Sequence, residues 1–212
     1  MTGRLLPLSL LLAALAAWPA WAQDAAKDAP PKDDWPCVQV LQPELSVGAM
    51  WPGDDPTAGG PAWRDDAVIA ALVDRVAPRR VPVDEATGEI HRFAAGYDGD
   101  RKAALTELFA GVFETINTER GTIIRGIRRF NSRQEALAKR IEASTQTLDG
   151  IDPASTDTAV ARQRQELEFQ LSWDQRVFDD RERLLPAICD QPFVLERRLF
   201  ALSRTIQEEI GK

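Results

Sequence analysis

Apolar residues recur every seven positions through the middle of the chain, from about residue 100 to residue 148. Two registers carry the repeat: Phe109, Ile116, Ile123, Phe130, Leu137 and Ser144 in one, and Phe113, Arg120, Ile127, Gln134, Ile141 and Leu148 in the other. A heptad pattern sustained over this length is typical of a long helix with a continuous apolar seam. It predicts a helix that would extend for about 70 Å at 1.5 Å per residue if it is unbroken.

Residues 149–153 predict a turn that reverses the chain direction, and a weaker heptad pattern follows this turn. That segment contains the glycine and the proline that commonly end helices, and Ser155 or Thr156 can cap the next helix. Apolar residues then return in two registers: Val160, Leu167 and Ile188, and Leu171, Phe178 and Leu185. We therefore predict a long antiparallel, coiled-coil-like helical hairpin over residues 100–188.

Two features leave open where the return helix ends and which chain fills the seam of the hairpin. Pro186 should kink or end the return helix, so that Gln191-Pro192 begins a separate C-terminal helix over residues 192–210. The apolar residues of that helix form one broad face: Phe193, Leu195, Leu199, Leu202, Ile206 and Ile210. Polar residues also stand at seam positions, and they leave open whether the seam is filled within one chain or by a homodimer: Arg120, Gln134 and Asp174.

Shorter helices are expected before the hairpin. Two aspartates followed by apolar residues at helical spacing predict a helix from near Trp63 that stops before Pro78. A second short helix follows Pro82, with Asp84 as its N-cap. Gly88 weakens this prediction and leaves a small β-hairpin at residues 87–88 as the alternative.

The segments before these helices are not predicted to be helical. Residues 37–62 mix short apolar pieces with proline and glycine, which predicts an extended arm that wraps the helical body. Its apolar residues are expected to be buried: Val38, Val40, Leu41, Leu45, Met50 and Trp51. Residues 23–36 combine prolines and charges with few branched aliphatic residues, so we expect a flexible linker there. Residues 63–212 form the helical domain, and the predicted fold class is all-α.

The first 22 residues resemble an export signal. Arg4 supplies the positive charge, Leu5–Ala17 are apolar, and residues 20–22 read Ala-Trp-Ala, the small-x-small pattern that a signal peptidase cuts. The apolar stretch is shorter than the roughly 20 residues needed to span a bilayer, so a retained anchor is the less favoured alternative. We therefore predict cleavage near Ala22 and a periplasmic or secreted protein.

Cys37 and Cys189 are the only cysteines. Two thiols in one chain most simply form one disulfide in an oxidising compartment, and that bond would tie the arm to the C-terminal helices. Two free or intermolecular thiols are the alternative. The distance between the two positions in the sequence excludes a CxxC redox motif.

Charge narrows the range of partners. The chain has 26 basic and 33 acidic residues and a formal net charge of −7, which argues against nucleic acid and against anionic lipid as partners. One basic cluster departs from this balance and is the candidate interaction patch. Its partner could be an acidic protein segment, lipid headgroups or an anionic polymer, since guanidinium groups bind both carboxylate and phosphate bidentately. The cluster consists of Arg120, Arg125, Arg128, Arg129 and Arg133. The alternative is a solvated face paired with acids of the return helix: Glu166, Glu168, Asp174, Asp179 and Asp180.

Known patterns for catalysis and metal binding are not matched. His91 is the only histidine, and no serine or cysteine nucleophile stands in a recognisable motif. Residues 98–100 resemble the start of a calcium loop, but Ala103 and Phe109 occupy the positions that need a glycine and an acid. Asp100 more simply caps the long helix. We therefore predict no catalytic residue, no cofactor and no metal site.

Three glycines fall inside the predicted long helix: Gly111, Gly121 and Gly126. Each costs roughly 1 kcal/mol relative to alanine in a helix interior. Close approach of another element is one explanation, because a residue without a side chain allows tight crossing. Simple tolerance near a mild bend is the other.

These features favour a protein that binds rather than one that catalyses. Long hairpins expose much surface and few concave pockets, which suits adaptors, periplasmic chaperones and assembly factors of cell-envelope complexes. One alternative is a small-ligand-binding domain or minor enzyme with an aromatic pocket formed by four residues: Trp51, Trp63, Tyr97 and Trp173. Another is a peripheral membrane protein that uses its amphipathic C-terminal helix.

Overall fold

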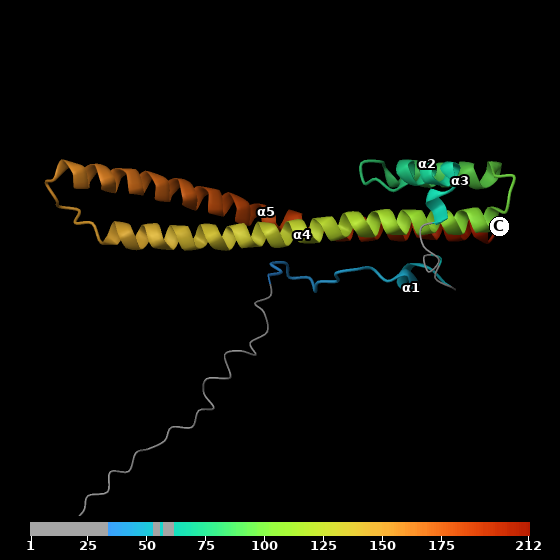
Figure 1. The fold of residues 1–212 in the computed structure, drawn as a ribbon, viewed down its shortest axis with the longest axis horizontal. Coiled ribbons are helices and arrows are strands. Elements are labelled where there is room, and N and C mark those ends of the chain that lie inside the picture. Colours follow the sequence, from blue (N-terminus) through green and yellow to red (C-terminus); the bar gives the residue numbers. More distant parts are fainter. Residues whose placement is uncertain (1–33, 53–55, 57–61) are drawn as a thin grey trace, which may run out of the picture. The chain divides into compact units, whose positions relative to one another are not determined.

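The described part of the chain consists of helices joined by short connections. A computed structural model describes residues 34–52, 56 and 62–212, and residues 34–212 form one unit. Its elements are shown in Figure 1: α1 (Val47–Met50), η2 (Ala62–Arg64), α2 (Ala67–Val76), α3 (Val83–Gly96), α4 (Arg101–Asp149) and α5 (Thr158–Ile210). No strand occurs within these ranges, and the predicted all-α class is confirmed. The predicted signal peptide and residues 23–33 of the predicted linker lie outside the described residues.

Helices α4 and α5 form the predicted antiparallel hairpin (Figure 1). α4 begins as expected at Asp100, whose carboxylate accepts a hydrogen bond from the Ala103 amide at 3.0 Å. The cap of α5 differs from the prediction. Asp157, rather than Ser155 or Thr156, accepts from the Ala159 amide at 2.7 Å. A carboxylate at this position also interacts favourably with the positive end of the helix dipole.

α5 continues through both prolines, so the predicted break between residues 186 and 192 is wrong. Pro186 and Pro192 lie inside one helix that ends at Ile210. A proline in a helix interior removes a backbone hydrogen bond and costs about 3 kcal/mol. Immediately afterwards, Leu195 and Leu199 are completely buried, and this packing holds the helical path despite the loss. The hairpin and the expected C-terminal helix are therefore one continuous structure.

The seam between α4 and α5 is filled within one chain. The apolar positions of the predicted registers are buried or half-buried along both helices. Of the polar seam residues, Gln134 donates through Nε2 to the Phe178 carbonyl at 3.2 Å. Asp174 is buried and receives Arg140 in a bidentate contact at 2.7 and 2.6 Å. These polar pairs fix the register of the two helices, because a shift along the seam would leave buried polar groups without partners.

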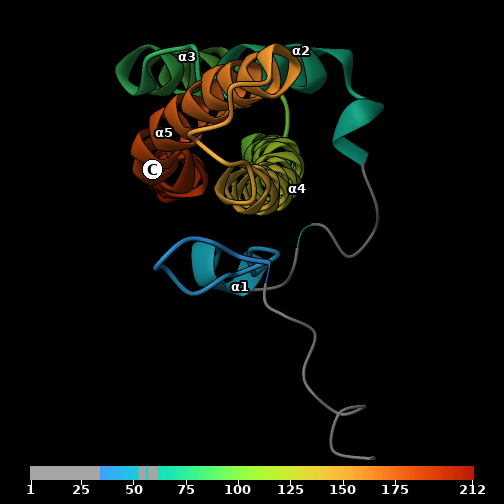
Figure 2. The same cartoon turned by 90° about the vertical axis from the view of Figure 1, so that its left-hand side faces the viewer.

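Helices α2 and α3 cover one end of the hairpin and build the main core there. Figure 2 shows them on one side of α4 and α5, with the arm and α1 on the other side. α2 begins at Asp66, whose carboxylate accepts from two amides of the first turn. α3 has Pro82 rather than Asp84 as its N-cap, and it is an unbroken helix, so the β-hairpin alternative at residues 87–88 is wrong. Asp84 lies in the first turn of α3, where its carboxylate is close to the positive end of the helix dipole.

Only one of the three glycines in α4 lies at a close crossing. A Cβ added to Gly111 would lie 2.5 Å from Val73 Cγ2 and 2.9 Å from Trp63 Cδ2. The nearest atoms to such a Cβ at Gly121 and Gly126 are ends of arginine side chains, at 3.4 and 3.9 Å. Gly111 is therefore required by the approach of α2 and η2, whereas the other two glycines are tolerated.

The apolar face of the last part of α5 belongs to this core. Leu195, Leu199 and Ile206 are fully buried, and Arg198 is buried beside them. The Arg198 guanidinium donates to the carbonyls of Val76, Ala77 and Val81 at 2.5, 2.9 and 2.6 Å, and so satisfies the C-terminal end of α2. An apolar face used in this way is not free to insert into a bilayer interface. Among the described helices, none is long and apolar enough to cross a membrane.

Candidate functional site

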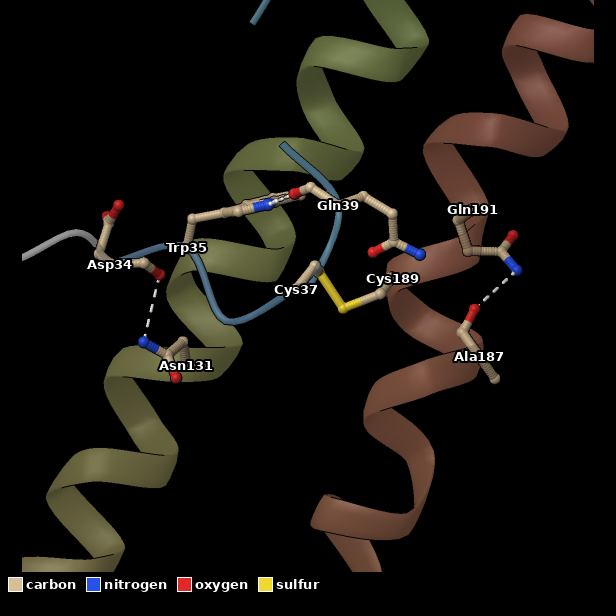
Figure 3. The surroundings of a disulfide bond; sticks show 8 residues. All are labelled: Asp34, Trp35, Cys37, Gln39, Asn131, Ala187, Cys189 and Gln191. Carbon is tan, nitrogen blue, oxygen red and sulfur yellow. Dashed lines mark hydrogen bonds between the residues drawn. A yellow bond between two sulfur atoms is a disulfide. The ribbon is translucent and has the colours of Figure 1, made fainter. Parts of the chain in front are cut away.

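The arm is fixed to the hairpin at its first residues (Figure 3). Cys37 and Cys189 form the predicted disulfide, with Cα atoms 5.7 Å apart and a sequence separation of 152. Close by, Asn131 of α4 donates from Nδ2 to the Asp34 carbonyl at 3.1 Å. The last residues of the predicted linker are thus attached to α4, and the arm that follows is attached to α5.

Arg120 anchors the next part of the arm from inside the seam. Only 2% of this residue is exposed. Its Nη1 donates to the Gln42 carbonyl at 2.5 Å, and its Nε donates to Glu196 of α5 at 2.7 Å. Three elements therefore meet at one buried guanidinium. Arg120 was predicted as part of an interaction patch, but its burial gives it a structural role and removes it from the accessible surface.

The arm buries fewer apolar side chains than predicted. Val38 is 98% exposed and Val40 is 81% exposed. The disulfide at Cys37 and the hydrogen bond from Arg120 to Gln42 hold this part of the arm. The side chains of Val38 and Val40 between them face solvent. Further along, Leu45 and Met50 pack against the core, and Trp51 stacks on Phe109 with ring centroids 4.2 Å apart. The prediction of burial is correct for this second half of the arm.

The remaining arginines of the candidate patch differ in their surroundings. Arg128 Nε lies 3.0 Å from Asp34 Oδ1 of the arm. Arg125 donates to the Thr122 hydroxyl at 2.9 Å. Arg129 and Arg133 are exposed, and neither makes an ion pair with another described residue. These three exposed arginines, Arg125, Arg129 and Arg133, follow one another at intervals of four residues, and we call them the basic face.

The acids of the return helix do not neutralise the basic face. Asp174 is bound by Arg140, Glu168 pairs with Arg164 on its own helix, and Asp180 pairs with Arg183. None of the five arginines of the cluster pairs with the five acids named in the alternative. Arg120 instead pairs with another acid of α5, Glu196. Within the cluster, only Arg125, Arg129 and Arg133 are exposed, whereas Arg120 lies in the seam between α4 and α5.

A groove lies between the arm and α4, next to the basic face. Its volume is about 380 Å³, and Leu41, Pro43, Ile124 and the two arginines Arg125 and Arg128 are among its lining residues. It is open to solvent, and its lining also includes the acidic residue Glu44 and the polar residues Asn117 and Thr118.

Three of the four aromatic residues proposed to share a pocket belong to the main core instead: Trp51 and Trp63 are buried in it, and Tyr97 packs against it. Trp51 stacks on Phe109, and Trp63 donates to Glu114 at 3.0 Å. Tyr97 packs on Phe93. Trp173 lies on α5 and is 57% exposed. The aromatic pocket was predicted from composition, whereas the structure uses Trp51, Trp63 and Tyr97 in core packing and leaves Trp173 exposed on α5.

His91 belongs to a small cluster of polar contacts between α3 and the end of α5. Its Nδ1 lies 2.7 Å from Glu209 Oε1, and Lys212 Nζ lies 2.5 Å from the same oxygen. The hydrogen bond from Lys212, and after it the one with His91, lowers the pKa of the Glu209 carboxyl against the opposing effect of burial. The sequence did not reveal this contact, because residues 91 and 209 are distant in the chain. Its position indicates a structural tie between two helices.

The sequence reasoning also missed an exposed aromatic pair on α5. Phe169 is 73% exposed and Trp173, one turn further on, is 57% exposed. A signal was present, because both residues fall outside the two apolar registers that face α4. Aromatic side chains that a seam does not use are candidates for contact with another molecule.

Comparisons with protein-family models, with curated proteins and with solved structures find no match for this chain.

Proposed function

We propose that this protein is an exported, non-catalytic helical adaptor, chaperone or assembly factor for a cell-envelope complex, acting through protein–protein contacts. The observation that carries the proposal is the basic face of α4. Arg125, Arg129 and Arg133 are exposed and have no acidic partner among the described residues, in a chain whose formal net charge is −7. Charge segregated in this way favours an acidic partner and accelerates its association.

The partner that fits this surface is an acidic protein segment. Side chains four residues apart on a helix rise by about 6 Å, so three successive guanidinium groups form a short linear array. Carboxylates on a partner helix at the same spacing can pair with all three, and guanidinium groups bind carboxylates bidentately. The neighbouring groove offers a place for one apolar side chain of the same segment.

Export is supported by two independent features. The N-terminal residues match the pattern of a cleaved signal, and the disulfide between Cys37 and Cys189 is of the kind that persists in oxidising compartments. The mature protein isolated from its own cells should therefore begin at Gln23. Mass spectrometry of the intact chain measures this directly, and a full-length cytoplasmic product would contradict export.

The proposed function is tested by reversing the basic face. We expect the variant Arg125→Glu/Arg129→Glu/Arg133→Glu to lose the partner that crosslinking and mass spectrometry recover with the wild-type protein in its native compartment. The matched control is Arg80→Glu/Lys102→Glu/Lys139→Glu, which changes the net charge equally at exposed basic residues that, like those of the basic face, make no ion pair with another described residue. The control should retain the partner, and circular dichroism should show unchanged helicity for both.

Two results would contradict the proposal. One is recovery of no envelope protein above background with the wild-type chain. The other is equal loss of the partner by the basic-face variant and by its control, which would indicate an effect of net charge instead of a docking surface.

A further inference from the structure

A second exposed face lies on α5, toward the end of the hairpin that is distant from α2 and α3 (Figure 1). Phe169 and Trp173 stand at its centre. Charged residues flank this pair at helical spacing, and all six side chains are exposed. We call this set the aromatic face: Arg162, Glu166, Phe169, Trp173, Arg176 and Asp180.

The aromatic face is turned away from the rest of the hairpin. The α5 residues that meet α4, such as Leu171 and Phe178, lie on roughly the opposite side of the helix, because successive residues are rotated by about 100°. Arg162, Glu166 and Arg176 make no ion pair with any residue the structure describes. Asp180 pairs only with Arg183 on its own helix, at 2.7 Å.

The order of residues on this face is self-complementary in the antiparallel sense. When a second α5 lies antiparallel with Phe169 opposite Trp173 of the other copy, Glu166 comes opposite Arg176 and Arg162 comes opposite Asp180. Positions spaced alternately by four and three residues form such layers in paired helices. Twofold symmetry repeats each contact, so two aromatic pairs and four opposite-charge pairs form together.

We propose that the aromatic face binds a second copy of this chain, with the two α5 helices antiparallel. A parallel pair would place Arg176 against Arg176 and Asp180 against Asp180, and like charges facing each other are destabilising. In the antiparallel arrangement, each charged residue of the face lies opposite a residue of opposite charge, and both aromatic side chains are covered.

The dimer should be weak and concentration-dependent. The face from Arg162 to Asp180 extends for about 27 Å along the helix, and an interface of this length lies at the small end of specific protein–protein contacts. Dissociation in the micromolar range is therefore expected. The aromatic face and the basic face lie on different helices, so self-association and binding of an acidic partner can succeed or fail independently.

Sedimentation of the full mature chain over a range of concentrations tests the proposal. We expect the mass to rise from monomer to dimer, and Trp173→Glu to weaken the association at least tenfold. Phe200→Glu is the matched control, because Phe200 is also on α5 and is also 57% exposed but lies outside the face. The control should dimerise like the wild type. Circular dichroism verifies that both variants keep their helicity.

Charge reversal tests the antiparallel register itself. Arg176→Glu places two carboxylates opposite each other and should weaken the dimer. Adding Glu166→Arg restores opposite charges in the same layer and should restore the wild-type association. A wild-type chain that stays monomeric at all concentrations, a double variant without recovery, or equal weakening by Phe200→Glu would each overturn the proposal. The proposal would also be overturned if Trp173→Glu dimerised like the wild type but lost a crosslink to a different protein.

Discussion

At the scale of single residues, Gly111 determines how closely α4 approaches α2 and η2. We expect Gly111→Ala to lower the free energy of unfolding by about 1–3 kcal/mol, since the new Cβ would overlap Val73 and Trp63. Gly126→Ala is the control, because its Cβ would meet only the end of Arg129 at 3.9 Å. That variant should gain up to about 1 kcal/mol from helix propensity. Urea unfolding measures both, and equal effects at the two sites would contradict this account.

Glu209 gives the contact between α3 and α5 a predictable pH dependence. Its pKa is lowered in the folded protein, so the stability it contributes is present above the ordinary pKa of glutamate, about 4.3, and is lost as the pH falls through the folded value. Glu209→Gln should therefore lower the Tm at neutral pH, and the difference from wild type should shrink below about pH 4.

The neighbouring Glu208 provides the control for this experiment. It is exposed and pairs with Arg204 in the same helix, a type of contact worth little. Glu208→Gln should leave the Tm nearly unchanged across the pH range. A Tm difference for Glu209→Gln that persists at acid pH would show that its ionisation does not matter.

At the scale of elements, the arm depends on its disulfide. Closing a loop of this length stabilises the folded state by about 5 kcal/mol in the chain-entropy model. Cys37→Ser/Cys189→Ser should therefore unfold at a clearly lower urea concentration. A reducing agent should lower the stability of the wild type to that of the double variant and leave the double variant unchanged. If reduction has no effect on the wild type, the disulfide does not stabilise the protein by constraining the unfolded chain.

The elements also differ in how far local sequence determined them. The heptad repeat of α4 and the cap at Asp100 were sufficient to predict that helix almost to its last residue. The prolines of α5 gave a wrong boundary, because the cost of a proline is local, whereas the packing that offsets it buries Leu195 and Leu199 in a core shared with other helices. Caps at Pro82 and Asp157 were missed by one or a few residues for a similar reason, since several neighbouring residues can begin a helix.

At the scale of the whole molecule, filling of the seam within one chain decides which surfaces are open to partners. Gln134 and Asp174 find their partners on the opposite helix, so the hairpin needs no second chain to complete its interior. The exposed basic face of α4 and aromatic face of α5 then remain as surfaces for other molecules. The basic face is proposed to bind an acidic partner, and the aromatic face is proposed to bind a second copy of the chain.

The sequence by itself determined the helical class, the hairpin, the reversal near residue 150 and the pairing of the two cysteines. These features depend on periodicity, on helix-ending residues and on the number of thiols, all of which are local or compositional. Only the tertiary structure decided that Arg120 is buried, that Val38 is exposed, and that residues 158–210 form one helix. The reason is physical: burial and hydrogen bonding are fixed by neighbours distant in the chain, and a single sequence does not show which distant residues meet.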